Sequence, residues 1–226
     1  MFRFKELIEL WRSDNLLTQA LKDSQKMLNS TSQMFNESVK SLRESDSGKM
    51  GMDIYAKDRM VNKYQREVRR KVLKHLAIAG GVNLTHGLIL INIVIDLERI
   101  GDYTKNIMEL AVAHPKRLRC GIYEDDIKKI EQGVSSMFKQ IVPALKASDK
   151  KAARQLIDSD WWMIKRCDEV VTGLIKAEDQ TLSSADAVST ALYARYLKRI
   201  AAHLINVSSS VVNPFERIGF REKKAE

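Results

Sequence analysis

The stretch that decides the fold is DLERIGDYTKNI, residues 96–107, which lies inside a longer apolar pattern of helical period. Five of its positions recur with an offset of 100 residues: Leu97, Arg99, Ile100, Asn106 and Ile107 return as Leu197, Arg199, Ile200, Asn206 and Val207. A pattern that returns at a fixed distance indicates a duplicated structural unit.

Working outward from this stretch, apolar residues recur three and four apart over six segments, which is the pattern of amphipathic helices. The predicted helices span residues 15–44, 54–79, 84–114, 125–147, 150–178 and 185–212. No segment alternates apolar and polar residues for long enough to predict a strand. The sequence therefore predicts an all-α fold.

The best boundary in the chain is the segment PKRLRCGIY, residues 115–123, which holds a proline, a glycine and three basic residues. It separates three predicted helices from three more. We therefore expect a first three-helix repeat over residues 1–114, a linker over 115–123, and a second repeat over 124–226, the two forming tandem three-helix bundles.

Composition limits the classes of protein to which this chain can belong. Of 226 residues, 44% are hydrophobic, and the formal net charge is +9. The two cysteines, Cys120 and Cys167, form no metal-binding spacing and suit a reducing compartment. Residues 1–11 do not resemble a secretory signal, and the longest apolar stretch, residues 88–95, is too short to span a bilayer. The basic cluster within residues 66–74 favours a solvated helix face over a nucleic-acid surface.

Glu98 and Asp102 are the clearest candidates for chemistry, because a spacing of four places both carboxylates on one face of a helix. A cation relieves the repulsion of such a pair, and oxygen ligands suit hard metals such as iron, manganese, magnesium or calcium. Gly101, between them, suggests close approach by a neighbouring helix or a bound cluster. The alternative is ordinary ion pairing, for example of Glu98 with Lys105.

Through residues 96–107 the chain resembles the PhoU family, whose signature has the form D-L-E-R-I-G-D-x-x-x-N-I. The long first helix, the Asp58-x-x-x-Asn62 spacing in the second and the repeated layout are similar too. The resemblance implies two three-helix bundles related by a pseudo-twofold axis, each carrying a metal cluster held by paired acidic motifs. In the first repeat these motifs are Glu98 with Asp102 and Asp58 with Asn62, where Asn62 replaces the usual acid and weakens the site.

The second repeat departs from the family pattern. Lys198, Ala201 and Ala202 stand where the first repeat has Glu98, Gly101 and Asp102, and Asp160 is at most a remnant of the upstream motif. We therefore expect one metal site at most. The resemblance implies iron first, with manganese, magnesium, calcium or zinc as alternatives. His203, next to the lost motif, is interpreted as a helix-surface residue.

The resemblance implies a cytoplasmic regulator rather than an enzyme. It would contact an ABC phosphate transporter and a sensor histidine kinase, reach the membrane through these partners, and restrain phosphate uptake and the starvation response. An alternative is an accessory protein of another phosphate permease, such as a sodium-phosphate cotransporter. A basic nucleic-acid-binding protein is disfavoured. A homodimer is compatible with such bundles, but no feature of the sequence requires one.

Overall fold

The computed structural model describes residues 15–47, 51–79, 81–147 and 149–220. These residues form six long helices and no strand, which confirms the all-α prediction. The helices are α2 (Leu16–Glu44), α3 (Ile54–Ile78), α4 (Leu84–Ala113), α5 (Glu124–Ala147), α6 (Lys150–Ile175) and α7 (Ser184–Val212), with short 3-10 turns η1 (Gly121–Tyr123) and η2 (Phe215–Arg217). Within the described residues, none of these helices is both long and apolar enough to cross a membrane.

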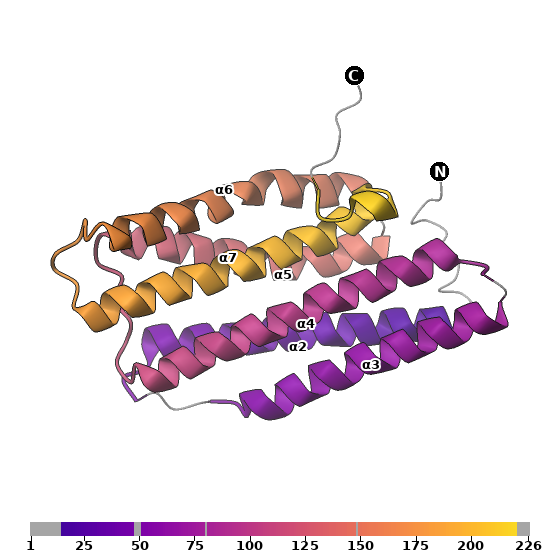
Figure 1. The fold of residues 1–226 in the computed structure, drawn as a ribbon, viewed down its shortest axis with the longest axis horizontal. Helices are drawn as coiled ribbons and strands as arrows, with labels where there is room; N and C mark the ends of the chain where they lie inside the picture. The colour runs from indigo at the N-terminus through magenta and orange to yellow at the C-terminus, as the bar shows by residue number, and fades with distance from the viewer. Residues whose placement is uncertain (1–14, 48–50, 80, 148, 221–226) are drawn as a thin grey trace, which may run out of the picture.

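The helices form two three-helix units that lie side by side (Figure 1). Helices α2, α3 and α4 pack together in the first unit, and α5, α6 and α7 pack together in the second. The third helix of each unit lies in the middle of the molecule, where α4 packs against α7, and α2 also contacts α5. The predicted pair of three-helix bundles is therefore confirmed.

Polar residues that accept backbone hydrogen bonds begin four of the helices. Asn15, Asp53, Asp149 and Ser183 accept from the free N–H groups of the first turns of α2, α3, α6 and α7. Helix α6 ends at Ile175, three residues before the predicted end, because Ala177 adopts a left-handed backbone conformation with φ of 53°.

Gly101 lies where α4 packs against both other helices of its unit. A Cβ atom added there would lie 3.5 Å from Val61 of α3 and 3.6 Å from Thr31 of α2, which is ordinary van der Waals contact. Both neighbouring helices therefore pack against position 101, but neither approaches so closely that only glycine fits.

The segment predicted as a linker packs closely against the first unit. Leu118 and Cys120 are buried, and the Leu118 N–H donates to the carbonyl oxygen of Leu42 at 3.0 Å. Burial raises the pKa of the Cys120 thiol to about 11, so this cysteine is a core residue rather than a reactive thiol.

Arg43, near the end of α2, ties the two units together. Its Nε donates to Glu131 of α5 at 3.0 Å, its Nη2 donates to Glu124, and its Nη1 donates to the carbonyl oxygen of Leu118. The Tyr193 hydroxyl of α7 donates to the same Glu131 carboxylate at 2.8 Å. Burial raises the pKa of Glu131, and the charge of Arg43 counteracts this. The guanidinium thus compensates the buried Glu131 carboxylate and shares the partly exposed Glu124 with Lys128.

We expect Arg43→Met to lower the free energy of unfolding by about 3–5 kcal/mol, because it leaves the buried Glu131 without its cation, whereas Glu124 keeps its contact with Lys128 at 3.3 Å. Urea unfolding followed by circular dichroism measures this. The matched control is Arg59→Met on the exposed side of α3, which should change stability by less than about 0.5 kcal/mol. Equal effects of the two substitutions would show that the buried network does not hold the units together.

Candidate functional site

The four residues predicted as metal ligands gather where α3 faces α4. Glu98 and Asp102 lie one turn apart on α4, and Asp58 and Asn62 lie one turn apart on α3. The Asn62 side-chain amide donates to Asp58 Oδ2 at 3.4 Å. Lys105 links Asp58 to Asp102 across the two helices. We call Asp58, Asn62, Glu98 and Asp102 the acidic cluster.

Lys105 supplies a cation to the acidic cluster from one turn further along α4. Its Nζ lies 3.2 Å from Asp58 Oδ2 and 3.5 Å from Asp102 Oδ1. Arg99 adds a second cation, with Nη1 3.3 Å from Asp102 Oδ2 and Nε 3.7 Å from Glu98 Oε2. Ion pairing therefore occurs, although Lys105 pairs with the two aspartates rather than with Glu98.

Among the carboxylates of the acidic cluster, Glu98 is the one whose ionised form is most clearly destabilised by its surroundings. Burial raises the pKa of Glu98, and the negative charges of Asp102 and Asp58 raise it further. The charges of Arg99 and of Arg69, which α3 contributes, oppose this rise. Three carboxylates thus face three cations, so the group is electrically balanced as it stands.

The donor atoms of the acidic cluster have the chemistry that a hard metal ion prefers, but their arrangement does not fit one. Within the part of the chain that the structure describes, no three carboxylate, imidazole or thiol groups come together in a way that could hold a metal. A metal ion would also have to displace the Lys105 ammonium from Asp58 and Asp102. The metal cluster that the resemblance implies therefore stays a prediction, and the folded arrangement favours Lys105 as the counter-ion.

The second repeat has a lysine, Lys198, where the first repeat has Glu98. Lys198 of α7, at the position of Glu98, places its Nζ 2.6 Å from both carboxylate oxygens of Asp168 on α6. Its partner is thus Asp168, which sequence reasoning did not select, and the side chain of Asp160 lies outside the described residues. In both repeats a lysine of the third helix pairs with an aspartate of the second helix.

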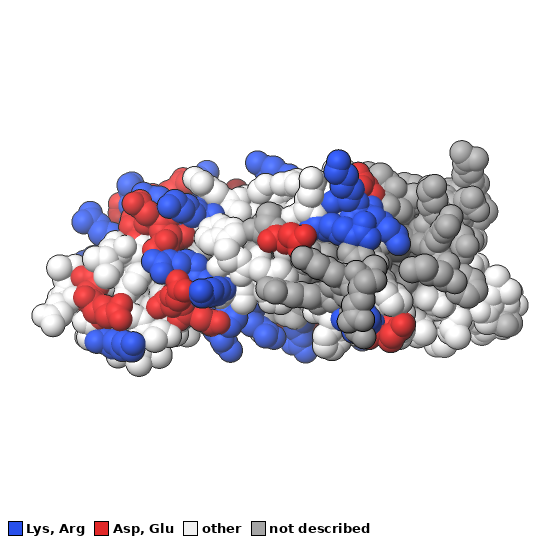
Figure 2. All heavy atoms as spheres, turned by 90° about the horizontal axis from the view of Figure 1, so that it is seen from above, with Lys and Arg blue, Asp and Glu red and all other residues white. Residues whose placement is uncertain are grey.

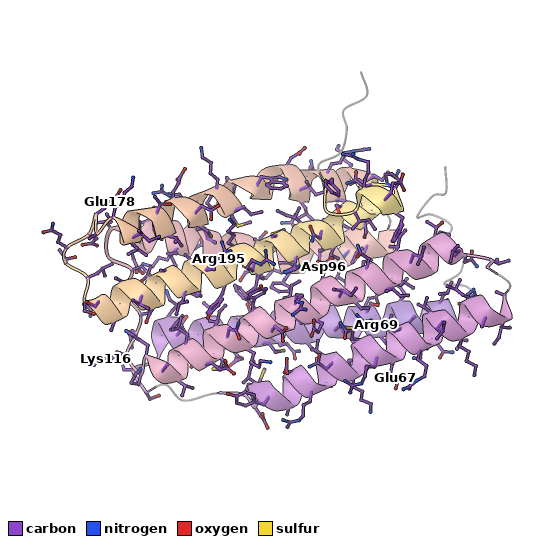
Figure 3. All side chains as sticks on the ribbon, in the orientation of Figure 1. Glu67, Arg69, Asp96, Lys116, Glu178 and Arg195 are labelled. Carbon is purple, nitrogen blue, oxygen red and sulfur yellow. The ribbon has the colours of Figure 1, made fainter. Side chains whose placement is uncertain are left out.

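The interpretation of His203 as a surface residue is wrong. Its side chain is 13% exposed, and its Nδ1 lies 2.8 Å from Asp96 Oδ1 across the interface of α4 and α7. Asn206 donates to the same oxygen at 3.1 Å, and the Tyr103 ring stacks on the imidazole. Figure 3 shows Asp96 on the side of α4 that faces α7. The sequence signal was the position of His203 three residues after the buried Ile200.

Comparison with known proteins follows the same division into repeats. The family model for the PhoU domain matches twice, over residues 25–111 and over residues 127–211. The chain belongs to the PhoU family. The solved structure of PhoU from Pseudomonas aeruginosa is similar, with a TM-score of 0.78, 18% identity, and coverage of 87% of this chain and 95% of that one. The phosphate transport system regulatory protein PhoU from Streptococcus pneumoniae matches with a TM-score of 0.75, 17% identity, and coverage of 87% and 93%.

A search of curated proteins gave no match. At these identities the two solved structures establish a shared fold, and the PhoU family match supports a regulator of phosphate transport. The family is regulatory rather than enzymatic, which agrees with the expectation drawn from the sequence.

We expect Lys105→Met to lower the free energy of unfolding by about 1–2 kcal/mol, because Asp58 and Asp102 lose their shared cation. Manganese should then raise the melting temperature of this variant and leave that of the native protein unchanged. Lys198→Met is the matched control, since it frees only the single carboxylate of Asp168 and should not respond to manganese. Differential scanning fluorimetry with and without the ion measures all three proteins.

The metal site would be favoured if the native protein itself depended on a bound metal ion for its stability. In that case a chelator would lower the melting temperature of the native protein, and elemental analysis would find a metal that the Glu98→Ala and Asp102→Ala double variant lacks.

Proposed function

We propose that this protein is a non-enzymatic regulator of phosphate uptake and phosphate-starvation signalling, acting on the cytoplasmic side of the membrane. It binds an ABC phosphate transporter and a sensor histidine kinase, and it restrains both when phosphate is plentiful. The observation that supports the proposal is the match of both repeats to the PhoU domain. The name of the Streptococcus pneumoniae protein with the same fold, a phosphate transport system regulatory protein, agrees with it.

The two-unit architecture suits a protein that responds to one partner and acts on another. Arg43 and its carboxylate partners join the first unit to the second, and Asp96 with His203 joins them again along α4 and α7. A partner that displaces one unit must therefore strain contacts to the other unit, which is the physical basis for coupling two binding surfaces. In the folded arrangement Lys105, Arg99 and Arg69 together balance the three carboxylates of the acidic cluster.

A second candidate function is an accessory role for another phosphate permease, such as a sodium-phosphate cotransporter. The divergence of the second repeat favours it. Lys198 and Ala202 replace both carboxylates of the motif there, so the two units present different surfaces to a partner. A changed surface can select a changed transporter within the same physiology.

Cross-linked capture of the tagged protein from membranes of cells grown in high and in low phosphate, followed by mass spectrometry, tests the proposal. We expect subunits of an ABC phosphate importer and a histidine kinase, with recovery that depends on phosphate supply. Capture without cross-linker and with the tag alone are the controls. Recovery of a different phosphate permease would favour the second candidate, and recovery of no transporter or kinase under either condition would overturn the proposal.

A further inference from the structure

One face of α3 points away from the rest of the molecule and is strongly basic. Helix α3 forms the lower edge of the molecule in Figure 1, furthest from α6. Its exposed residues follow the spacing of three and four that marks one side of a helix. We call this set the α3 face: Tyr55, Arg59, Lys63, Arg66, Arg70, Leu73 and Lys74. From Arg59 to Lys74 it extends for roughly 22 Å at about 1.5 Å per residue.

The cations of the α3 face have few acidic neighbours. Arg70 pairs with Glu67 at 2.6 Å, and among the described residues no ion pair joins Arg59, Lys63, Arg66 or Lys74 to a carboxylate. On the side of the molecule opposite α3, basic and acidic groups are interleaved, as the left half of Figure 2 shows. Arg166 and Asp126 are an example of such interleaved charges, with Arg166 Nη2 2.6 Å from Asp126 Oδ2. The α3 face is therefore a positive surface whose charge is available to a ligand.

The α3 face also contains exposed apolar side chains, and others adjoin it. Leu73 is 70% exposed and Ile78 is 73% exposed. Val82 and Leu84, which lie just before and at the start of α4, are 61% and 50% exposed. At the other end Tyr55 is 44% exposed, and its hydroxyl donates to Glu109 of α4 at 3.3 Å. Leu73 and Ile78 thus expose apolar surface at the same end of α3 as the cations Arg70 and Lys74.

We propose that the α3 face docks on an anionic lipid bilayer. Lysine and arginine are attracted to the negative surface of such a bilayer, while Leu73 and Ile78 at one end of the face enter the interfacial region. A straight row of cations on the outermost helix can meet a flat surface along its whole length. Nucleic acid would match the charge, but its phosphate backbone offers no apolar medium for Leu73 and Ile78.

This inference does not depend on the proposed function, because lipid alone is the ligand. It would add a direct contact with the membrane to any contact through a transporter. Each cation held against an anionic surface strengthens binding about fivefold, so three of them account for about a hundredfold.

Sedimentation of the full chain with lipid vesicles tests the proposal. We expect binding to vesicles of phosphatidylcholine mixed with phosphatidylglycerol, none to phosphatidylcholine alone, and weakening as salt is raised. The Arg59→Glu, Lys63→Glu and Arg66→Glu triple variant should bind at least about a hundredfold more weakly. The matched control carries Lys129→Glu, Lys139→Glu and Lys151→Glu, an equal change of charge at exposed positions of α5 and α6, and should keep its binding.

The apolar contribution is tested by Leu73→Ser with Ile78→Ser, which should reduce the binding that survives at high salt. Circular dichroism melting checks that every variant folds. The proposal is overturned if the native chain fails to bind anionic vesicles, if both triple variants lose binding equally, or if duplex DNA is bound through the α3 face and the vesicles are not.

Discussion

The rest of the structure depends on the packing of α4 against α7, the third helices of the two units. Each of these helices is covered by its own unit on one side and by the other unit on the opposite side. An apolar surface around most of a helix is the usual consequence of such burial. The polar residues that remain in the interface must find partners there, and Asp96 finds His203 and Asn206. This contact fixes how the two units are placed along one another, because a shift by one turn would leave a buried carboxylate unpaired.

The helices and their division into two repeats could be predicted from the sequence because both depend on local information. Spacings of three and four residues predict each helix, and the recurrence of Leu97, Arg99 and Ile100 predicts the duplication. The ends were less certain, as α6 shows, because a single left-handed residue stops a helix whose apolar pattern continues.

The partners within the site could not be predicted in the same way, because they are distant in the sequence. Lys105 and Asp58 are separated by 47 positions, Arg43 and Glu131 by 88, and Asp96 and His203 by 107. Sequence spacing placed Glu98 and Asp102 on one side of α4 correctly, but it could not show which cation would reach them. Whether a metal ion or a lysine balances these carboxylates depends on the neighbouring turn and the neighbouring helix.

Two adjacent charged residues of α3 have different surroundings. Asp58 faces α4 and is compensated by Lys105, whereas Arg59, the next residue, points outward and has no ion-pair partner among the described residues. A compensated charge holds helices together, and an uncompensated one is available to a ligand. Because the two residues belong to one helix, a ligand that displaces α3 from outside also changes the separation of Asp58 from Lys105. Any such displacement of α3 would therefore change the energy of the ion pair between Lys105 and Asp58.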